Sequence, residues 1–187
     1  MNGVDKDLWV SFINGDDKAL NSLYNNFVDV LYSFGLRFSD DVDLVKDSIH
    51  DLFVDLYKYR KTLSNDVNVK SYLFTALKRK ICLVLKKKAL RESHVFETPF
   101  LLSGNIEDQI IDDEEQSILL AKLRKQLALL PSRQKEAVYL RFNSELEYEE
   151  IAAIMEVSLE TCRTLVYRGV KQLRERMVVN HIYKILA

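Results

Sequence analysis

Glycine and proline are scarce in this chain of 187 residues, which contains five of the first and two of the second. Both residues supply tight turns and interrupt regular structure, so their scarcity argues against a turn-rich β-sheet protein and favours long helices. The two cysteines, Cys82 and Cys162, have no CxxC partner and no neighbouring histidine cluster, and we expect both to be reduced core residues. We therefore predict an all-α fold.

Several classes of protein are disfavoured by what the sequence lacks. No apolar run approaches the roughly 18 residues that cross a bilayer, and no charged-then-apolar leader opens the chain. The histidines, at positions 50, 94 and 181, lie on separate segments, with no phosphate loop and no metal-ligand spacing. We expect a cytoplasmic protein without membrane insertion, cofactor, metal or catalytic residues, and hence no enzyme activity.

Charge is segregated along the chain, although the formal net charge is only −1. One basic block precedes the middle of the chain and a second lies near its end. The first contains Lys78, Arg79, Lys80, Lys86, Lys87, Lys88 and Arg91, and the second contains Arg163, Arg168, Lys171, Arg174 and Arg176. Between them lie Glu107, Asp108, Asp112, Asp113, Glu114 and Glu115. This acidic run is either a solvated linker or a tether that lies against basic protein or occupies a nucleic-acid channel.

Apolar residues recur at spacings of three and four on both sides of a break, which predicts two small helical domains. Residues 91–112 lose this period and contain Pro99 and Gly104. We expect a first domain at residues 1–95, a flexible acidic linker at 96–112 and a second domain at 113–187. In the second domain the segment from Glu147 to Met155 and the segment from Ser158 onward form a helix-turn-helix.

The last predicted helix is suited to a DNA major groove. Its core stripe is Cys162, Leu165, Val166, Gly169 and Leu173, which leaves its polar residues facing outward. Polar residues near a helix start can reach base edges, while later basic residues hold phosphates. The candidates are Ser158 at the N-cap, Thr161, Arg163, Thr164 and Tyr167 for base edges, and Arg168, Lys171 and Arg174 for phosphates. The alternative is a basic, solvated surface helix.

These residues carry a family resemblance that covers almost the whole chain. Leu130-Pro131, Arg133-Gln134, Leu140-Arg141-Phe142, Tyr148-Glu149-Glu150-Ile151-Ala152, Ser158, Thr161 and Arg168 resemble the promoter-reading domain of extracytoplasmic-function (ECF) sigma factors, in the sigma-70-type family. The first half resembles the same family at Asp47-Ser48-Ile49-His50-Asp51-Leu52-Phe53 and at Val69-Lys70-Ser71-Tyr72-Leu73-Phe74.

The resemblance implies partners and site residues. The partners are core RNA polymerase through its β′ clamp helices, promoter DNA and an anti-sigma factor. Polymerase binding would fall to Asp47, Ile49, His50, Asp51 and Phe53, although Phe53 is equally suited to the core. Opening and reading of the −10 element would fall to Lys70, Tyr72, Lys78, Arg79, Lys80 and Lys86, where core packing is the alternative for Tyr72. The residues given above for the last helix would read the −35 element.

Six positions depart from the family pattern. Arg79, Leu83 and Val84 replace the usual Asn and Asp-Tyr pair in the helix that follows the Tyr-Leu-Phe segment. Glu147 replaces a capping Ser, Glu156 replaces the turn Gly, and Leu165 replaces an Arg of the last helix. We expect Glu147 to cap poorly, and Glu156 to cost about 1 kcal/mol if its φ is positive.

The predicted function is that of an ECF-type sigma factor in transcription initiation. One alternative is a helix-turn-helix regulator that acts without core polymerase, which leaves residues 47–53 without a role. The other is a degenerate sigma-like interaction protein, suggested by Arg79, Leu83 and Val84.

Overall fold

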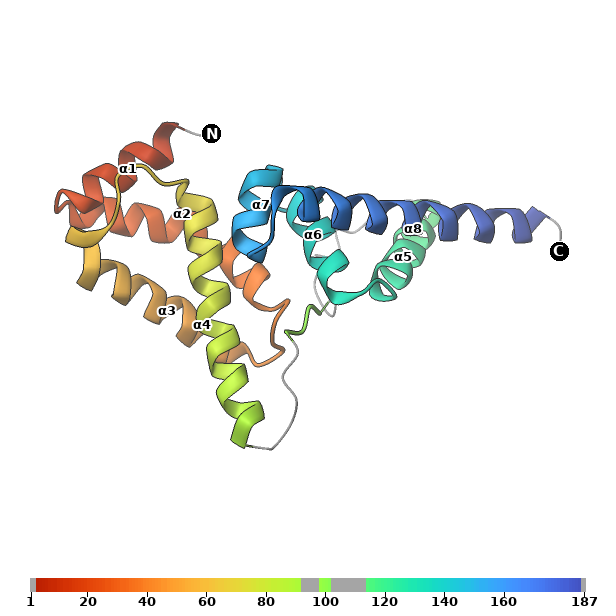
Figure 1. Cartoon of the computed structure of the whole chain (residues 1–187), viewed down its shortest axis with the longest axis horizontal. Helices are drawn as coiled ribbons and strands as arrows, with labels where there is room; N and C mark the ends of the chain where they lie inside the picture. The colour runs from red at the N-terminus through yellow and green to blue at the C-terminus, as the bar shows by residue number, and fades with distance from the viewer. Residues whose placement is uncertain (1–2, 92–97, 102–113, 186–187) are drawn as a thin grey trace. The chain divides into compact units, whose positions relative to one another are not determined.

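The computed structural model describes residues 3–91, 98–101 and 114–185, and every regular element in these ranges is helical. The all-α prediction is confirmed. The elements are α1 (Gly3–Ile13), α2 (Asp17–Gly35), α3 (Val42–Tyr59), the short 3-10 helix η1 (Arg60–Thr62), α4 (Val69–Arg91), α5 (Glu114–Ala128), α6 (Ser132–Phe142), α7 (Tyr148–Met155) and α8 (Leu159–Ile185), as Figure 1 shows.

The chain divides into two compact units, residues 1–99 and 100–187. The boundary falls inside the segment that we predicted as a linker. Phe100, also predicted as linker, is instead buried in the second unit, where its ring lies 5.5 Å from the ring of Tyr139. The acidic run from Glu107 to Asp113 lies outside the described residues.

Side-chain caps define where the helices of the first unit begin. The Asp16 carboxylate accepts a hydrogen bond from the Lys18 amide at 2.9 Å, and that of Asp41 accepts one from the Leu44 amide at 3.1 Å. Asn68 does the same before α4, where its side-chain oxygen accepts from the Ser71 amide at 2.9 Å. Each cap satisfies a backbone donor that has no partner within its helix.

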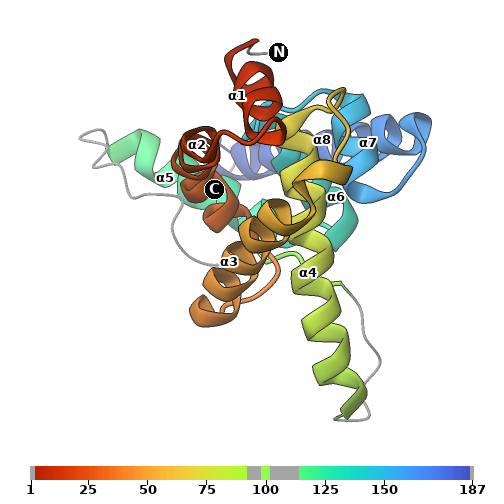
Figure 2. The same cartoon turned by 90° about the vertical axis from the view of Figure 1, so that its left-hand side faces the viewer.

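In the first unit α2 packs against α1, α3 and α4, and α3 also packs against α4. Figure 2 shows α3 (orange) beside α4 (yellow-green). The core between them is rich in aromatic and aliphatic side chains. Its largest fully buried members are Trp9, Phe12, Phe34, Phe38, Phe74, Leu23, Leu31, Leu73, Leu77 and Ile81. Trp9 also donates its indole N–H to the Ser64 carbonyl oxygen at 2.9 Å, which ties α1 to the segment ahead of α4.

Gly35 permits the close approach of α2 to α3. A Cβ atom at this position would lie 2.6 Å from Cγ1 of Val45 and 3.3 Å from Cδ1 of Ile81. Because a valine side chain is stiff at χ1, it cannot easily move aside. The helices can therefore approach to this distance only with glycine at position 35.

We predict that Gly35→Ala lowers the free energy of unfolding of the first unit by about 1–3 kcal/mol, the usual cost of overpacking a core. Amide hydrogen exchange of α2 and α3 measures this loss within the intact chain. In a Val45→Ala background the same glycine substitution should cost less, because the clashing methyl group is gone. Equal losses in both backgrounds would contradict the steric explanation.

In the second unit α8 packs against α5, α6 and α7. Cys162 and Val166 in its first half are buried, as are Ile151 and Ile154 of α7. Its second half contributes Leu173 to a buried cluster with Leu130 and Val138, and the partly buried Leu123, Leu127 and Val170 pack against that cluster. Figure 1 shows α8 (blue) as the long helix alongside α5 and α6.

Within the described residues, no helix is both long enough and apolar enough to cross a membrane. In the same residues no group of three or more histidine, cysteine, aspartate or glutamate side chains is placed to hold a metal ion.

Candidate nucleic-acid interface

The turn between α7 and α8 is built from a left-handed residue and a capping serine. Glu156 has φ 54° and ψ 50°, and the amide of the next residue, Val157, donates to the Ala152 carbonyl oxygen at 3.0 Å. Ser158 then caps α8, because its Oγ accepts a hydrogen bond from the Thr161 amide at 3.1 Å. The predicted N-cap is confirmed, and the condition set for strain at Glu156, a positive φ, is met.

Residues of α8 divide between its two faces largely as predicted. Cys162, Val166, Gly169 and Leu173 are buried, whereas Leu165, predicted on the same stripe, is half-buried. The outward face contains seven exposed candidates and the half-buried Thr164. The exposed residues are Ser158, Thr161, Arg163, Tyr167, Arg168, Lys171 and Arg174. Three phosphate candidates and the base-edge candidates thus share one accessible side of one helix.

Gly169 lets α8 approach α6. A Cβ atom on Gly169 would lie 2.7 Å from Cγ2 of Val138. Helices meet at this distance only where one of them lacks a side chain, as at Gly35 in the first unit. The contact fixes the position of the outward face of α8 relative to the rest of the second unit.

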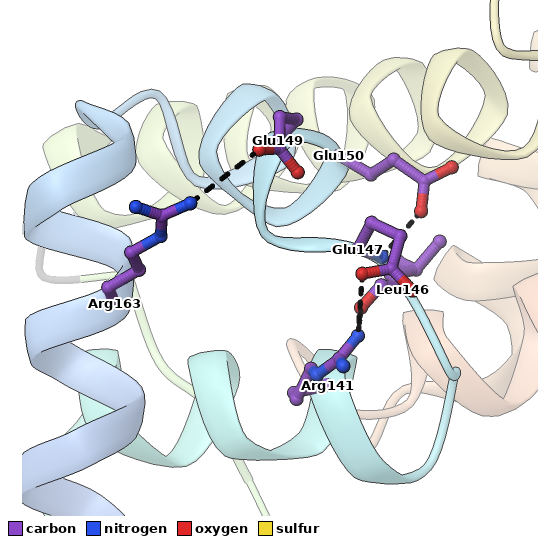
Figure 3. A network of polar contacts seen from close by, with 6 residues as sticks. All are labelled: Arg141, Leu146, Glu147, Glu149, Glu150 and Arg163. Atoms are coloured by element: carbon purple, nitrogen blue, oxygen red, sulfur yellow. Dashed lines mark hydrogen bonds and ion pairs between the residues drawn. The ribbon is translucent and has the colours of Figure 1, made fainter.

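The segment that joins α6 to α7 is held by Arg141. Its Nη1 donates to the Leu146 carbonyl oxygen at 2.8 Å and to Glu147 Oε2 at 3.1 Å. The Glu150 carboxylate accepts the backbone N–H of Glu147 at 2.6 Å, as the third helical residue does in a capping box. Figure 3 shows these contacts around Glu147. Our expectation that Glu147 caps poorly is therefore wrong, because Glu147 and Glu150 form a reciprocal capping box at the start of α7.

Arg163 contacts two residues of α7. Its Nη2 lies 3.9 Å from Glu149 Oε1, as Figure 3 shows, and its Cζ lies 5.8 Å from the ring centroid of Tyr148. The guanidinium carbon of Arg141 also lies over the Tyr148 ring, at 5.0 Å. Sequence analysis did not single out Tyr148 or Glu149 as site residues. Helical periodicity identifies one face of one helix, whereas this contact joins residues of two helices.

The charges of Glu149 and Arg163 both act on the thiol of Cys162, on the buried side of α8. Burial raises the pKa of the Cys162 thiol, and the negative charge of Glu149 raises it further, while Arg163 acts in the opposite direction. Cys162 is fully buried. It is thus a neutral thiol in the core, consistent with its expected structural role.

The predicted polymerase-binding residues on α3 fall into two groups. Asp47, His50 and Asp51 are exposed and lie three and four residues apart, so they share one edge of the helix. Ile49 and Phe53 are 3% and 7% exposed, and the Phe53 ring packs edge-on against Tyr24 at 5.0 Å. We correct their assignment as contact residues, because both side chains belong to the core of the first unit.

The six candidates for the −10 element all lie on α4 but differ in exposure. Arg79 and Lys86 are exposed, whereas Lys70, Tyr72, Lys78 and Lys80 are half-buried. Lys80 Nζ forms an ion pair with Asp55 Oδ2 at 2.6 Å, and Lys78 Nζ lies 5.8 Å from the ring centroid of Phe38. These two lysines are engaged within the first unit.

Tyr72 is also engaged within the first unit, where its ring lies 5.3 Å from that of Trp9. Burial raises the pKa of its hydroxyl, and Asp55 raises it further. In the structure Tyr72 therefore packs in the first unit, which was the alternative to a role at the −10 element.

A helix-turn-helix with one exposed basic face, in a chain that also forms a separate helical unit, is typical of helical DNA-binding proteins. The family model for sigma-70 region 4 matches residues 120–173, which contain most of α5 and the helix-turn-helix. The chain is 29% identical over 149 residues to the RNA polymerase sigma factor SigV of Bacillus subtilis (strain 168), covering 80% of this chain and 82% of the relative. It is 21% identical over 156 residues to the ECF RNA polymerase sigma factor SigM of the same strain, covering 83% and 93%.

Two solved structures share the fold. CnrH, in complex with the cytosolic domain of CnrY, has a TM-score of 0.62 at 16% identity, covering 94% of this chain and 97% of that one. The sigma factor RpoE of Bartonella quintana, in complex with the anti-sigma factor NepR, has a TM-score of 0.62 at 22% identity, covering 84% and 96%. The family-model match and the two relatives support a sigma factor of the ECF type in the sigma-70 family, a family that acts in transcription initiation and is not known for enzymatic activity.

The strained turn generates a stability prediction. Because a left-handed conformation costs a residue with a Cβ atom about 1 kcal/mol, we expect Glu156→Gly to raise the free energy of unfolding of the second unit by up to that amount. A urea titration followed through NMR signals of Ile151 and Val166 measures the gain. Glu175→Gly, at an exposed helical position in α8, should instead lower stability by about 1 kcal/mol. A loss at both positions would show that Glu156 is not strained.

Proposed function

We propose that this sigma factor directs core RNA polymerase to promoters through a division of labour between its two units. The second unit reads the −35 element with the outward face of α8. The first unit docks on the β′ clamp helices and helps to open the −10 element. The single observation that carries the proposal is the exposed row on α8, from Ser158 to Arg174, presented by a helix-turn-helix.

The charge on α8 explains how a nearly neutral chain can bind DNA. Arg168, Lys171 and Arg174 are exposed on the same helix as the residues suited to base edges. Cations that neutralise phosphates release counterions and supply affinity without sequence preference, whereas base-edge contacts supply the preference. Because these cations lie together on one helix, the net charge of −1 for the whole chain does not prevent this face from attracting DNA.

Docking on polymerase is assigned to the exposed edge of α3. Asp47 and Asp51 supply negative charge and His50 a further polar group, so the edge is complementary to a basic partner surface. Ile49 and Phe53 support this edge from the core. Their packing holds α3 in place and keeps the three polar side chains outward.

Strand opening is assigned to α4, chiefly to its exposed residues Arg79 and Lys86. Positive charge on this helix can hold the backbone of a displaced strand. Capture of unstacked bases by the complex compensates for the few kcal/mol lost when a base leaves the stack. The chain breaks and forms no bonds of its own in this scheme, and nucleotide chemistry belongs to the polymerase.

An anti-sigma factor completes the set of proposed partners. CnrH and RpoE are both seen in complexes, the first with the cytosolic domain of CnrY and the second with the anti-sigma factor NepR. We assign this chain an inhibitor of the same kind, together with core polymerase and promoter DNA. Its place of action is the cytoplasm, where polymerase and DNA are found.

Arg168→Ala tests the role of the second unit. We expect transcription from a promoter that depends on its −35 element to fall about tenfold, because a hydrogen bond to a charged group contributes about 1.5 kcal/mol. The salt dependence of DNA binding should become shallower by about one unit of slope. Arg124→Ala, which removes the same charge from an exposed position in α5, is the matched control and should change neither. Loss of core-polymerase binding by Arg168→Ala would overturn the division of labour.

Asp51→Lys tests the role of the first unit. Reversal of a charge in a complementary interface should weaken binding to core polymerase by about tenfold or more. Asp29→Lys, an equal charge change at an exposed position of α2, serves as control and should bind normally. Co-purification of each variant with core polymerase, followed by titration, gives the comparison. Equal affinity of the two variants would remove Asp51 from the proposed interface.

A further inference from the structure

Two neighbouring residues of α7 define the position of the Arg163 guanidinium. Glu149 Oε1 lies 3.9 Å from its Nη2, and the Tyr148 ring lies beneath it, with 5.8 Å between Cζ and the ring centroid. Figure 3 shows the Arg163 side chain of α8 pointing toward Glu149. A charge contact and a ring contact from two successive residues of α7 together restrict where the guanidinium lies.

Stability does not explain this arrangement. The side chains of Arg163 and Glu149 are 60% and 67% exposed, and an ion pair so exposed contributes little to the folded state. An arginine reads a base edge with a planar fork of donors, whose direction determines which base it can match. The Arg163–Glu149 ion pair is therefore better suited to setting the direction in which the Arg163 guanidinium points than to stabilising the fold.

A second ion pair on α8 has the same length and lacks that consequence. Lys171 Nζ lies 3.9 Å from Glu175 Oε1, with side chains 57% and 62% exposed. A lysine ammonium is a compact charge with three rotatable donors, so a neighbouring carboxylate changes its net field but not its selectivity. Removing the carboxylate of Glu175 changes only the charge near α8. Removing that of Glu149 also removes the group that holds the Arg163 guanidinium in place.

Resting on the proposed function, we propose that Tyr148 and Glu149 are specificity-determining positioning residues: they aim Arg163 at a base edge of the −35 element before DNA arrives. Neither needs to touch the DNA. Glu149 also places a negative charge 3.9 Å from Arg163, so a duplex that approaches Arg163 without a matching base meets a repulsion without compensation. Both effects favour the correct sequence over others.

The test uses holoenzyme reconstituted from core polymerase and the full chain. Duplexes selected from a random library by the unmodified holoenzyme provide the specific probe, and a scrambled duplex of equal composition provides the other. The measured quantity is the dissociation constant for the scrambled duplex divided by that for the selected duplex. We expect Glu149→Gln to tighten binding to the scrambled duplex and to lower the ratio by about two- to fivefold, the size of effect that an exposed ion pair allows.

Glu175→Gln is the matched control. It removes an equal charge from an equal ion pair, so we expect tighter binding to both duplexes and an unchanged ratio. Tyr148→Phe keeps the ring and should keep the ratio, whereas Tyr148→Leu removes the ring and should lower it. Because Tyr148 is half-buried, this pair of variants distinguishes loss of the ring contact from loss of the hydroxyl group.

Arg163→Ala links the test to the residue that is aimed. In an Arg163→Ala background, Glu149→Gln should no longer change the ratio. If Arg163→Ala alone leaves the ratio unchanged, the assignment of Arg163 to a base edge fails, and the proposed reading of the −35 element fails with it at this position. If Arg163→Ala lowers the ratio and Glu149→Gln does not, the positioning role alone is overturned.

Discussion

The contact between Gly169 and Val138 is the constraint on which the outward face of α8, the proposed DNA-binding surface, depends. It brings α8 against α6 at a distance that no other residue at position 169 would permit. The same helix packs against α7 and α5, and Leu173 beyond Gly169 belongs to the cluster against which Leu123 and Leu127 of α5 pack. Because one rigid helix carries both halves, the core cluster around Leu173 and the outward row from Ser158 to Arg174 are positioned together.

Much of the fold could be predicted because its signals are local. Three- and four-residue periodicity predicted the helices of both units, and Ser158 indicated where α8 begins. For Glu156 the sequence indicated only that a positive φ would be strained, because the family usually has glycine there, and the structure has φ 54° at this residue.

The candidate site was only partly predictable, because its remaining features arise between helices. The periodicity of α3 places Ile49 and Phe53 near an exposed edge, and only the packing of α2, including Tyr24, shows that they are buried. The start of α7 depends on Arg141 and Glu150, which sequence reasoning about Glu147 alone did not include. Lys80 had an ion-pair partner, Asp55, that lies on another helix.

The burial of Trp9 has a spectroscopic consequence. It is the single tryptophan of the chain, it is fully buried, and its indole N–H is bonded to the Ser64 carbonyl oxygen. Its fluorescence therefore reports on the first unit alone, while the second unit contributes no indole emission. A protein with two compact units thus contains a built-in optical label for one of them, and unfolding of the first unit can be followed separately without any added dye.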